Sequence, residues 1–215
     1  SSEDVLRVHA IEYVEVIRAM EAELASGQTP ASGFGFGTGD NPFFSRMYTA
    51  SLAYTSGSAR AAEAVRDGAR LAFNIAGGLH HAHRTRASGF CVFNDAAVAL
   101  AILRERFERV AYVDIDVHHG DGVQGLFLDD PTVLTCSIHE DPRTLFPGTG
   151  FLEETGSAFT SVNAPVPAGA TGEAWLAAFD GIVMAALERY RPQALVLQMG
   201  TDAHELDPLA HLRVT

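Results

Sequence analysis

The 215-residue sequence predicts an α/β fold in which helices cover both faces of a mainly parallel central sheet. One observation is that the strand-like segments are apolar along their whole length, as buried parallel strands are. A second is that helical patterns separate these segments, which is typical of parallel βαβ units. We also find no internal repeat and no linker, so we expect one domain over residues 1–215.

The first half of the chain is expected to be mainly helical. Residues 1–24 have apolar side chains three or four positions apart, the spacing of one helix face. The Gly-rich segment 25–42 has the length of functional or disordered loops. Residues 58–73 and 94–107 repeat the helical pattern, and Asn94 is of a residue type that caps helices.

The second half alternates strands with a helix. Apolar runs predict strands at 109–117, 132–139 and 192–200. Residues 172–191 have the pattern of a long amphipathic helix. A shorter apolar segment, "NIA" at 74–76, is a fourth candidate strand in the first half.

Charge and cysteine content exclude several classes of protein. The 27 acidic and 15 basic residues leave a net charge of -12, which argues against a nucleic-acid partner and mildly favours a cationic substrate. The two cysteines do not form a CxxC pair, so neither a disulfide framework nor a structural zinc knuckle is expected. We find no signal peptide and no long apolar run, and we expect a cytoplasmic protein without membrane contact.

Polar clusters follow all four strand-like segments. They are rich in His, Asp and Gly and occupy residues 77–90, 114–122, 136–150 and 199–208. Ligands of open α/β sheets bind at the carboxyl ends of the strands. Four such ends in one chain therefore predict a single functional site.

The segment "DIDVHHGDG", residues 114–122, contains the strongest metal-binding pattern. Side chains alternate along a strand, so Asp114, Asp116 and His118 point to one face. The alternative is a solvated strand end, but buried carboxylates require a cation or hydrogen bonds. Two carboxylates and one imidazole would leave a zinc ion open to water, as in catalytic sites. The second carboxylate would come from Asp202 or Asp207.

The tandem His80–His81 follows two glycines, which permit a sharp loop. A single histidine is more often a packed or surface residue, but two adjacent ones beside a metal loop favour acid–base chemistry. A histidine base needs a carboxylate that holds its tautomer. Asp114 and Asp121 are available for this purpose.

These motifs resemble the zinc-dependent histone deacetylase superfamily, which includes bacterial acetoin-utilisation proteins and acetylpolyamine amidohydrolases. The matching segments are "GGLHHAHRTRASGFCVFND", "VAYVDIDVHHGDGVQGLF", "CSIHEDPRTLFPGTG" and "LQMGTDAHELDPLAHL". The resemblance runs from about Asp40 to the end of the chain, in the same order. It implies the three-layer α/β/α fold of the arginase and deacetylase type.

The resemblance implies that Asp116, His118 and Asp207 are the zinc ligands. Asp207 is preferred to Asp202 because the matching family residue precedes a proline, as in "LDP". The same ligand types accept Fe²⁺, so the working metal stays open. A structural K⁺ would be bound by oxygens around five residues. These are Asp114, Asp116, His118, Ser137 and Ile138.

The resemblance also implies catalytic roles. His81 would be the general base, and His80 its electrostatic partner. Asp114 would pair with His80, and Asp121 with His81. The implied reaction is hydrolysis of an acetyl or other acyl group from an amine such as acetyl-lysine or an acetylpolyamine, by zinc-activated water.

The same resemblance implies which residues contact the substrate. Gly89 and Phe90 would line one wall of a narrow tunnel for the acyl chain, and Phe146 the other. Asp40 would hold the substrate backbone at the rim. For the two phenylalanines the alternative is packing in the core.

Two other functions are considered. A ureohydrolase with two manganese ions would need further bridging carboxylates, where "DVHHGD" has histidine and glycine. A non-catalytic scaffold that binds acyl-lysine or metal would lack deacetylase activity. The family pattern continues to a Gly-rich motif with an oxyanion tyrosine, and none of the five tyrosines follows such a motif. We therefore expect a partial catalytic domain that binds metal, deacetylates poorly and exposes an apolar sheet edge or core face.

Overall fold

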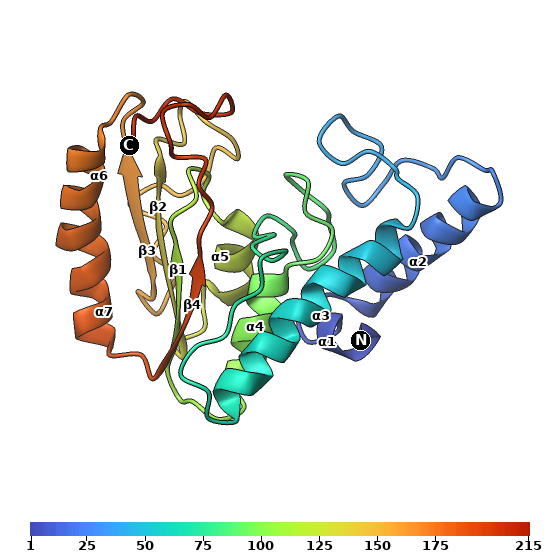
Figure 1. Ribbon diagram of the computed structural model, residues 1–215, viewed down its shortest axis with the longest axis horizontal. Coiled ribbons are helices and arrows are strands. Elements are labelled where there is room, and N and C mark those ends of the chain that lie inside the picture. Colours follow the sequence, from blue (N-terminus) through green and yellow to red (C-terminus); the bar gives the residue numbers. More distant parts are fainter. The chain divides into compact units, whose positions relative to one another are not determined.

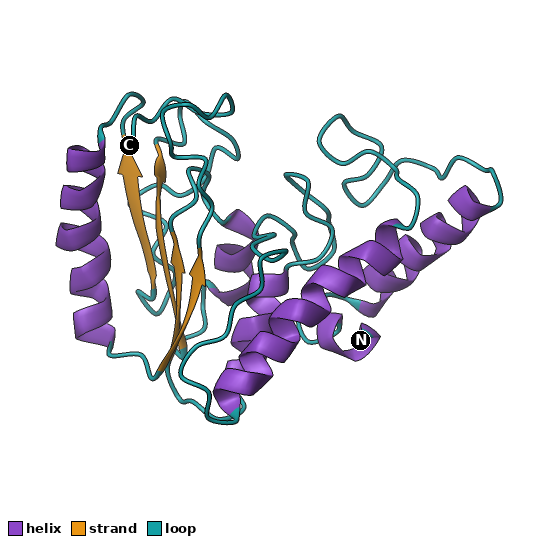
Figure 2. Ribbon diagram, in the orientation of Figure 1, coloured by secondary structure: helices purple, strands orange, loops and turns teal.

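The computed structural model describes all 215 residues, and the chain folds into two compact units, residues 1–105 and 106–215 (Figures 1 and 2). The first unit contains four helices. These are α1 (Ser2–Val5), α2 (Ile11–Ala25), α3 (Met47–Arg66) and α4 (Asp95–Leu103). Its core includes the buried side chains of Tyr13, Ile17, Met47 and Phe93. The Tyr13 hydroxyl donates a hydrogen bond to the Val92 carbonyl at 2.7 Å, so this buried polar group is satisfied.

The single helix predicted for residues 1–24 is wrong, because the chain turns between α1 and α2. Ala10 has an extended backbone, with φ -71° and ψ 145°. Its N–H donates to the Arg84 carbonyl at 3.0 Å instead of continuing a helix. The predicted helix at 94–107 is confirmed as α4, and the Asn94 side chain accepts from the Ala97 N–H at its start.

The predicted strand at 74–76 is also wrong. Asn74 uses its side chain locally: its amide donates to the Tyr54 carbonyl and to Ser58 Oγ, and its Oδ1 accepts from the Ala76 N–H. Side-chain hydrogen bonds of this kind compete with the ladder of a sheet. The segment is therefore a turn that leads into residues 77–82.

The second unit is built on a four-stranded sheet of order β3-β2-β1-β4, in which every pair is parallel. Its strands are β1 (Val110–Asp114), β2 (Val133–Glu140), β3 (Ser161–Val166) and β4 (Ala194–Gln198). β1 and β2 are buried along their whole length. The predicted parallel α/β architecture is thus confirmed.

The helices of this unit flank the sheet. They are α5 (Asp121–Phe127), α6 (Gly172–Ala178), the π-helical turn η1 (Phe179–Met184) and α7 (Ala185–Tyr190). Figure 1 shows α6 and α7 beside one face of the sheet and α5 beside the other. The expected helix over 172–191 is present, and η1 interrupts its regular α-helical hydrogen bonding.

The edges of the sheet differ from the interior strands. β3 was not predicted, because its sequence "SVNAPV" mixes polar residues and a proline with its apolar residues. Pro165 is tolerated because β3 pairs on one side only. At the other edge, β4 leaves Leu195 and Leu197 exposed by 46% and 44%. No helix in the chain combines the length and apolar character that crossing a bilayer requires.

The core of the second unit gives a first prediction. Leu134 in β2 is 3% exposed and belongs to this core, whereas Leu152 is 60% exposed. Leu134→Ala should lower the free energy of unfolding by about 2–5 kcal/mol, because it leaves a cavity among packed side chains. Leu152→Ala is the matched control and should leave urea denaturation nearly unchanged. Equal losses in the two variants would contradict this core assignment.

Candidate metal centre

The candidate metal centre lies just beyond the carboxyl ends of two neighbouring strands. β1 pairs in parallel with β4, and Asp114 lies opposite Gln198 at the end of this ladder. Asp116 and His118 follow β1, and Asp202 follows β4. Since parallel strands end at the same edge of a sheet, segments far apart in the sequence meet here.

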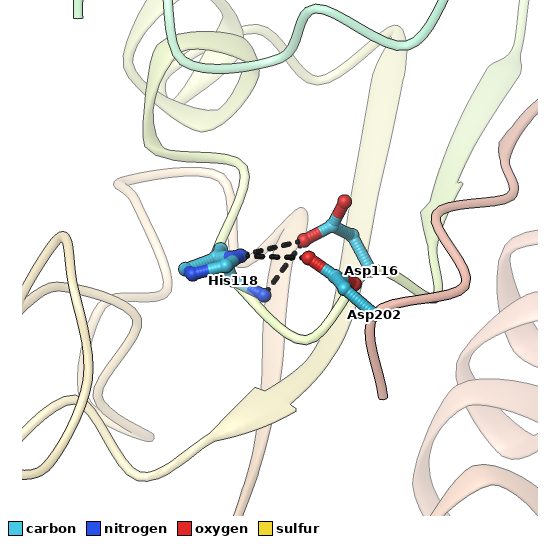
Figure 3. A group of neighbouring side chains, drawn as sticks. All are labelled: Asp116, His118 and Asp202. Carbon is cyan, nitrogen blue, oxygen red and sulfur yellow. Dashed lines mark hydrogen bonds and ion pairs between the residues drawn. The ribbon is translucent and has the colours of Figure 1, made fainter. Parts of the chain in front are cut away.

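Asp116, His118 and Asp202 form one compact group of metal-ligand atoms (Figure 3). His118 Nδ1 lies 3.1 Å from Asp116 Oδ1 and 3.0 Å from Asp202 Oδ2. The three side chains are only 12–18% exposed. The group is therefore a partly buried triad of two carboxylates around one imidazole nitrogen.

The other oxygen of each carboxylate is held by protein groups. Gln198 Nε2 donates to Asp116 Oδ2 at 2.9 Å, and the Val117 N–H donates to Asp202 Oδ1 at 2.9 Å. A Cβ at Gly200 would lie 2.1 Å from Asp116 Oδ2, so only glycine fits there. These contacts leave the remaining oxygen of each carboxylate directed at His118.

Sequence reasoning missed Gln198 and Gly200 as supports of the site. A signal was present for Gln198, because it is a polar residue at the end of the apolar segment "ALVLQ". For Gly200 the sequence carries no comparable signal, since the close approach arises only when β4 pairs with β1.

The two carboxylates control the charge of His118. Burial lowers the pKa of this histidine, but hydrogen bonds and charge from Asp116 and Asp202 outweigh burial and raise it to about 9. The metal-free imidazole is therefore protonated at neutral pH. This proton offsets part of the negative charge of the two adjacent carboxylates. A divalent cation would neutralise that charge more fully.

The residues present fit a zinc-like ion. Carboxylate oxygen and imidazole nitrogen are ordinary zinc ligands, and bonds of about 2.0–2.1 Å put tetrahedral ligand atoms about 3.3 Å apart. The observed 3.0 and 3.1 Å separations are close to that value. Three protein ligands also leave a coordination position open, as in catalytic sites.

The structure groups Asp202, and not the predicted third ligand Asp207, with Asp116 and His118. Asp202 comes four residues after the end of β4, where the chain still passes the end of β1. Asp207 lies further on, and its Oδ1 accepts the N–H of Leu209 at 2.9 Å within a local turn. The prediction relied on the following proline, Pro208, which in the structure lies within that turn; we therefore take Asp202 as the candidate third ligand.

Three of the five residues expected to bind K⁺, Asp114, Ser137 and Ile138, lie on the paired strands β1 and β2, and the other two follow β1. Asp114 is completely buried and lies opposite Ser137 in the β1–β2 ladder. The Tyr112 hydroxyl donates to Asp114 Oδ2 at 2.7 Å. Ile138 follows in the same strand and is also fully buried. The K⁺ site itself stays a prediction.

The histidine pair belongs to the first unit. His80 and His81 are 3% and 4% exposed, and their ring centroids lie 4.0 Å apart. The two rings thus form a close, buried pair, and their predicted acid–base role stays a prediction. Asp114 and Asp121 belong to the second unit, and their predicted pairing with the histidines stays a prediction.

The residues expected to contact substrate are mostly exposed. Phe90 and Phe146 are 65% and 41% exposed, so the alternative that they pack in the core is wrong. Gly89 and Phe90 both have positive φ, 49° and 66°, in a tight turn. The Phe146 ring centroid lies 6.3 Å from that of His118. Asp40 is exposed in the first unit.

Comparison with known proteins identifies the family. The family model of the histone deacetylase domain matches residues 1–215, so the chain belongs to the histone deacetylase family. The chain is 41% identical to the acetoin utilization protein AcuC of Bacillus subtilis over its whole length. It spans 57% of that relative.

Two solved structures are similar in fold. The acetylpolyamine aminohydrolase of Burkholderia pseudomallei has a TM-score of 0.92 and 31% identity, and the similarity covers 100% of this chain and 70% of that one. A histone deacetylase homologue from Aquifex aeolicus has a TM-score of 0.91 and 33% identity. This similarity covers 99% of this chain and 58% of that one. The fold predicted from the sequence resemblance is confirmed.

The pKa of His118 gives a prediction for metal uptake. At pH 7 the ion must displace the imidazole proton, so binding should release about one proton per ion. As the pH is lowered below 9, the apparent affinity for the metal ion should fall about tenfold per pH unit. Calorimetric titration in buffers of different ionisation enthalpy measures the released protons. Uptake at pH 7 without proton release would contradict the assignment.

The same pKa makes metal-free stability depend on pH. The folded pKa of about 9 lies above the ordinary value of 6.5. The stabilisation from the protonated triad should therefore be complete below pH 6.5 and lost as the pH rises through about 9. Chemical denaturation in the presence of a chelator at pH 6 and pH 9 checks this. His118→Gln should reduce the difference.

A pair of aspartate variants tests the corrected ligand. Asp202→Asn should weaken zinc binding by more than the roughly 10–100-fold that loss of an outer-shell partner costs. Asp207→Asn is the matched control and should retain the metal, because its carboxylate only accepts from a backbone N–H. Retention is measured by metal analysis after dialysis. The reverse pattern would restore Asp207 as the ligand.

Proposed function

We propose that this protein is a metal-dependent amidohydrolase that removes an acetyl or other acyl group from an amine. The observation that carries the proposal is the Asp116–His118–Asp202 group at the end of β1 and β4, in a chain of the histone deacetylase family. Two carboxylates and an imidazole, with one position open, are the ligands of a hydrolytic zinc site.

The bound metal ion would act as a Lewis acid on the acyl carbonyl and on the attacking water. We assign His81 as the group that takes a proton from this water. The His80–His81 pair then returns a proton to the departing amine nitrogen as the carbon–nitrogen bond breaks. Asp114 and Asp121 would hold the two imidazoles in the required tautomers. Acetate and a free amine are the products.

Support for the acid–base role comes from two sources. The two rings are buried and adjacent, so each changes the charge environment of the other. The histidine tandem also belongs to a motif in which the sequence resembles deacetylases. Zn²⁺ is the proposed metal, Fe²⁺ is an acceptable substitute, and K⁺ is proposed as a structural ion near Asp114.

Acetylated lysine side chains and acetylated small amines are the proposed substrates. The names of the similar proteins include a histone deacetylase homologue and an acetylpolyamine aminohydrolase. From the sequence resemblance, Gly89, Phe90 and Phe146 are the proposed contacts of the substrate chain. Asp40, with its exposed carboxylate, would bind substrate backbone at the rim. The net charge of -12 favours amine-bearing substrates.

Two histidine variants test the mechanism. His81→Ala should abolish hydrolysis of an acetylated peptide while zinc content stays unchanged, because His81 is not a ligand. His80→Ala should reduce kcat less, since it acts through charge and not as the primary proton acceptor. A panel of acetylated peptides and acetylpolyamines supplies the substrates, and metal analysis follows each preparation.

Three results would contradict the proposal. Loss of zinc in His81→Ala would make this histidine part of the metal site. Equal losses of kcat in the two variants would remove the proposed division between them. A zinc-loaded wild-type protein that binds acyl-lysine without hydrolysing any substrate of the panel would favour the non-catalytic scaffold.

A further inference from the structure

The loop that carries the histidine pair, residues 77–82, is held by two adjacent side chains at the start of α4. Asn94 and Asp95 are 0% and 1% exposed. Neither received a role in binding or catalysis from the sequence. All their contacts described below lie within the first unit.

Asp95 binds the backbone that precedes the histidines. Its carboxylate accepts from the Leu79 N–H at 2.8 Å and from the Gly78 N–H at 3.1 Å. It also accepts from the Ser58 hydroxyl at 2.5 Å. Burial raises the pKa of Asp95, and the Ser58 hydroxyl and the two amides oppose this rise. A carboxyl group is thus kept in the interior with three donors directed at it.

Asn94 binds the loop backbone at His80 and just after the histidine pair. Its Nδ2 donates to the His80 carbonyl at 3.1 Å and to the Ala82 carbonyl at 3.0 Å. Both amide hydrogens are therefore used on the loop. Its Oδ1 accepts from the Ala97 N–H at 2.9 Å, which caps α4. The cap requires only this oxygen, so the contacts to the loop are additional to it.

A buried histidine completes the support of Asn94. The Asn94 N–H donates to His9 Nε2 at 2.9 Å. Burial lowers the pKa of His9 to about 4, so the imidazole is neutral at physiological pH and its Nε2 stays an acceptor. His9 therefore helps to fix Asn94, the residue that binds the loop.

The loop also packs closely against Asp95 and Ser58 at Gly77. A Cβ at Gly77 would lie 2.5 Å from Asp95 Oδ2 and 2.7 Å from Ser58 Oγ. Asn74 Nδ2 donates to the same Ser58 oxygen at 2.9 Å. The backbone before the histidines is thus set against a buried polar cluster that leaves no space for a side chain.

We infer that Asn94 and Asp95 are positioning residues for the His80–His81 pair, which fix the backbone on both sides of the two rings. The inference rests on the proposed function. With the backbone fixed, only side-chain torsions remain to orient each imidazole, and their 4.0 Å ring separation is maintained. Proton transfer depends steeply on such geometry, and a displacement of about 1 Å can cost about 100-fold in rate.

Asp95→Asn is the principal test. The amide replaces one acceptor oxygen by a donor that faces the Ser58 hydroxyl or a backbone N–H, so the loop must move. We expect kcat to fall about 100-fold with KM little changed, because the metal centre is untouched. Zinc content should stay at the wild-type level. The pH profile of kcat should also shift, since the two histidines would interact differently.

Two further variants control for stability. Ser58→Ala removes one donor to Asp95 and should lower kcat less than Asp95→Asn. Thr55→Val alters a fully buried hydroxyl in the same helix, which donates only to the Ser51 carbonyl. It should leave kcat near the wild-type value. If Asp95→Asn does not fold, the comparison of Ser58→Ala with Thr55→Val decides the question.

A readout independent of catalysis separates this inference from the proposed function. Long-range ¹H–¹⁵N NMR reports the tautomers and pKa values of His80 and His81. These should change in Asp95→Asn and Ser58→Ala, but not in Thr55→Val. Unchanged imidazole signals in a folded Asp95→Asn protein, or equal changes in Thr55→Val, would overturn the inference. If the wild type hydrolyses no substrate, the proposed function fails, and these signals alone judge the positioning role.

Discussion

The parallel ladder between β1 and β4 places Asp114 opposite Gln198, and the candidate metal centre depends on this register. Asp116 and Asp202 come from segments more than eighty residues apart, and they meet because both strands end at the same edge. Gln198 then binds the outer oxygen of Asp116, and the glycine at position 200 lets the backbone pass close to it. A shift of one residue in the register would turn these side chains to the opposite face. The fold therefore constructs the site through strand pairing and not through local sequence.

Two carboxylates around one imidazole define the electrostatics of this edge. In a largely buried position, neither carboxylate is well solvated by water, so positive charge is required nearby. A proton on His118, whose pKa is raised to about 9, supplies this charge, and a metal ion at the candidate site would supply it through the same atoms. Such an ion would have to compete with this proton. The outer hydrogen bonds from Gln198 and Val117 limit how far either carboxylate can relax.

Much of the architecture could be predicted from local sequence patterns, because β1, α4 and the first part of β2 are mainly apolar and polar or capping residues lie at their ends. The sequence also predicted that Asp116 and His118 lie together, and the structure does group them, although β1 ends at Asp114 and both residues follow it. What failed depended on tertiary contacts. β3 was not predicted, because its proline and polar residues are tolerated only at a sheet edge. Residues 74–76 form a turn and not a strand, because the Asn74 side chain hydrogen-bonds to α3. Asp202 could not be separated from Asp207 without knowing where the chain leaves β4.

The turn at Gly89 and Phe90 has a consequence for engineering stability. Phe90 adopts φ 66°, a left-handed conformation that costs a non-glycine residue about 1–2 kcal/mol, and its ring is 65% exposed. The backbone geometry here suits glycine or asparagine better than phenylalanine. A selection based on thermal resistance alone would therefore favour replacement of this aromatic ring. At this position, a design procedure that optimises folding energy would choose glycine or asparagine. A procedure that preserves surface chemistry would keep phenylalanine.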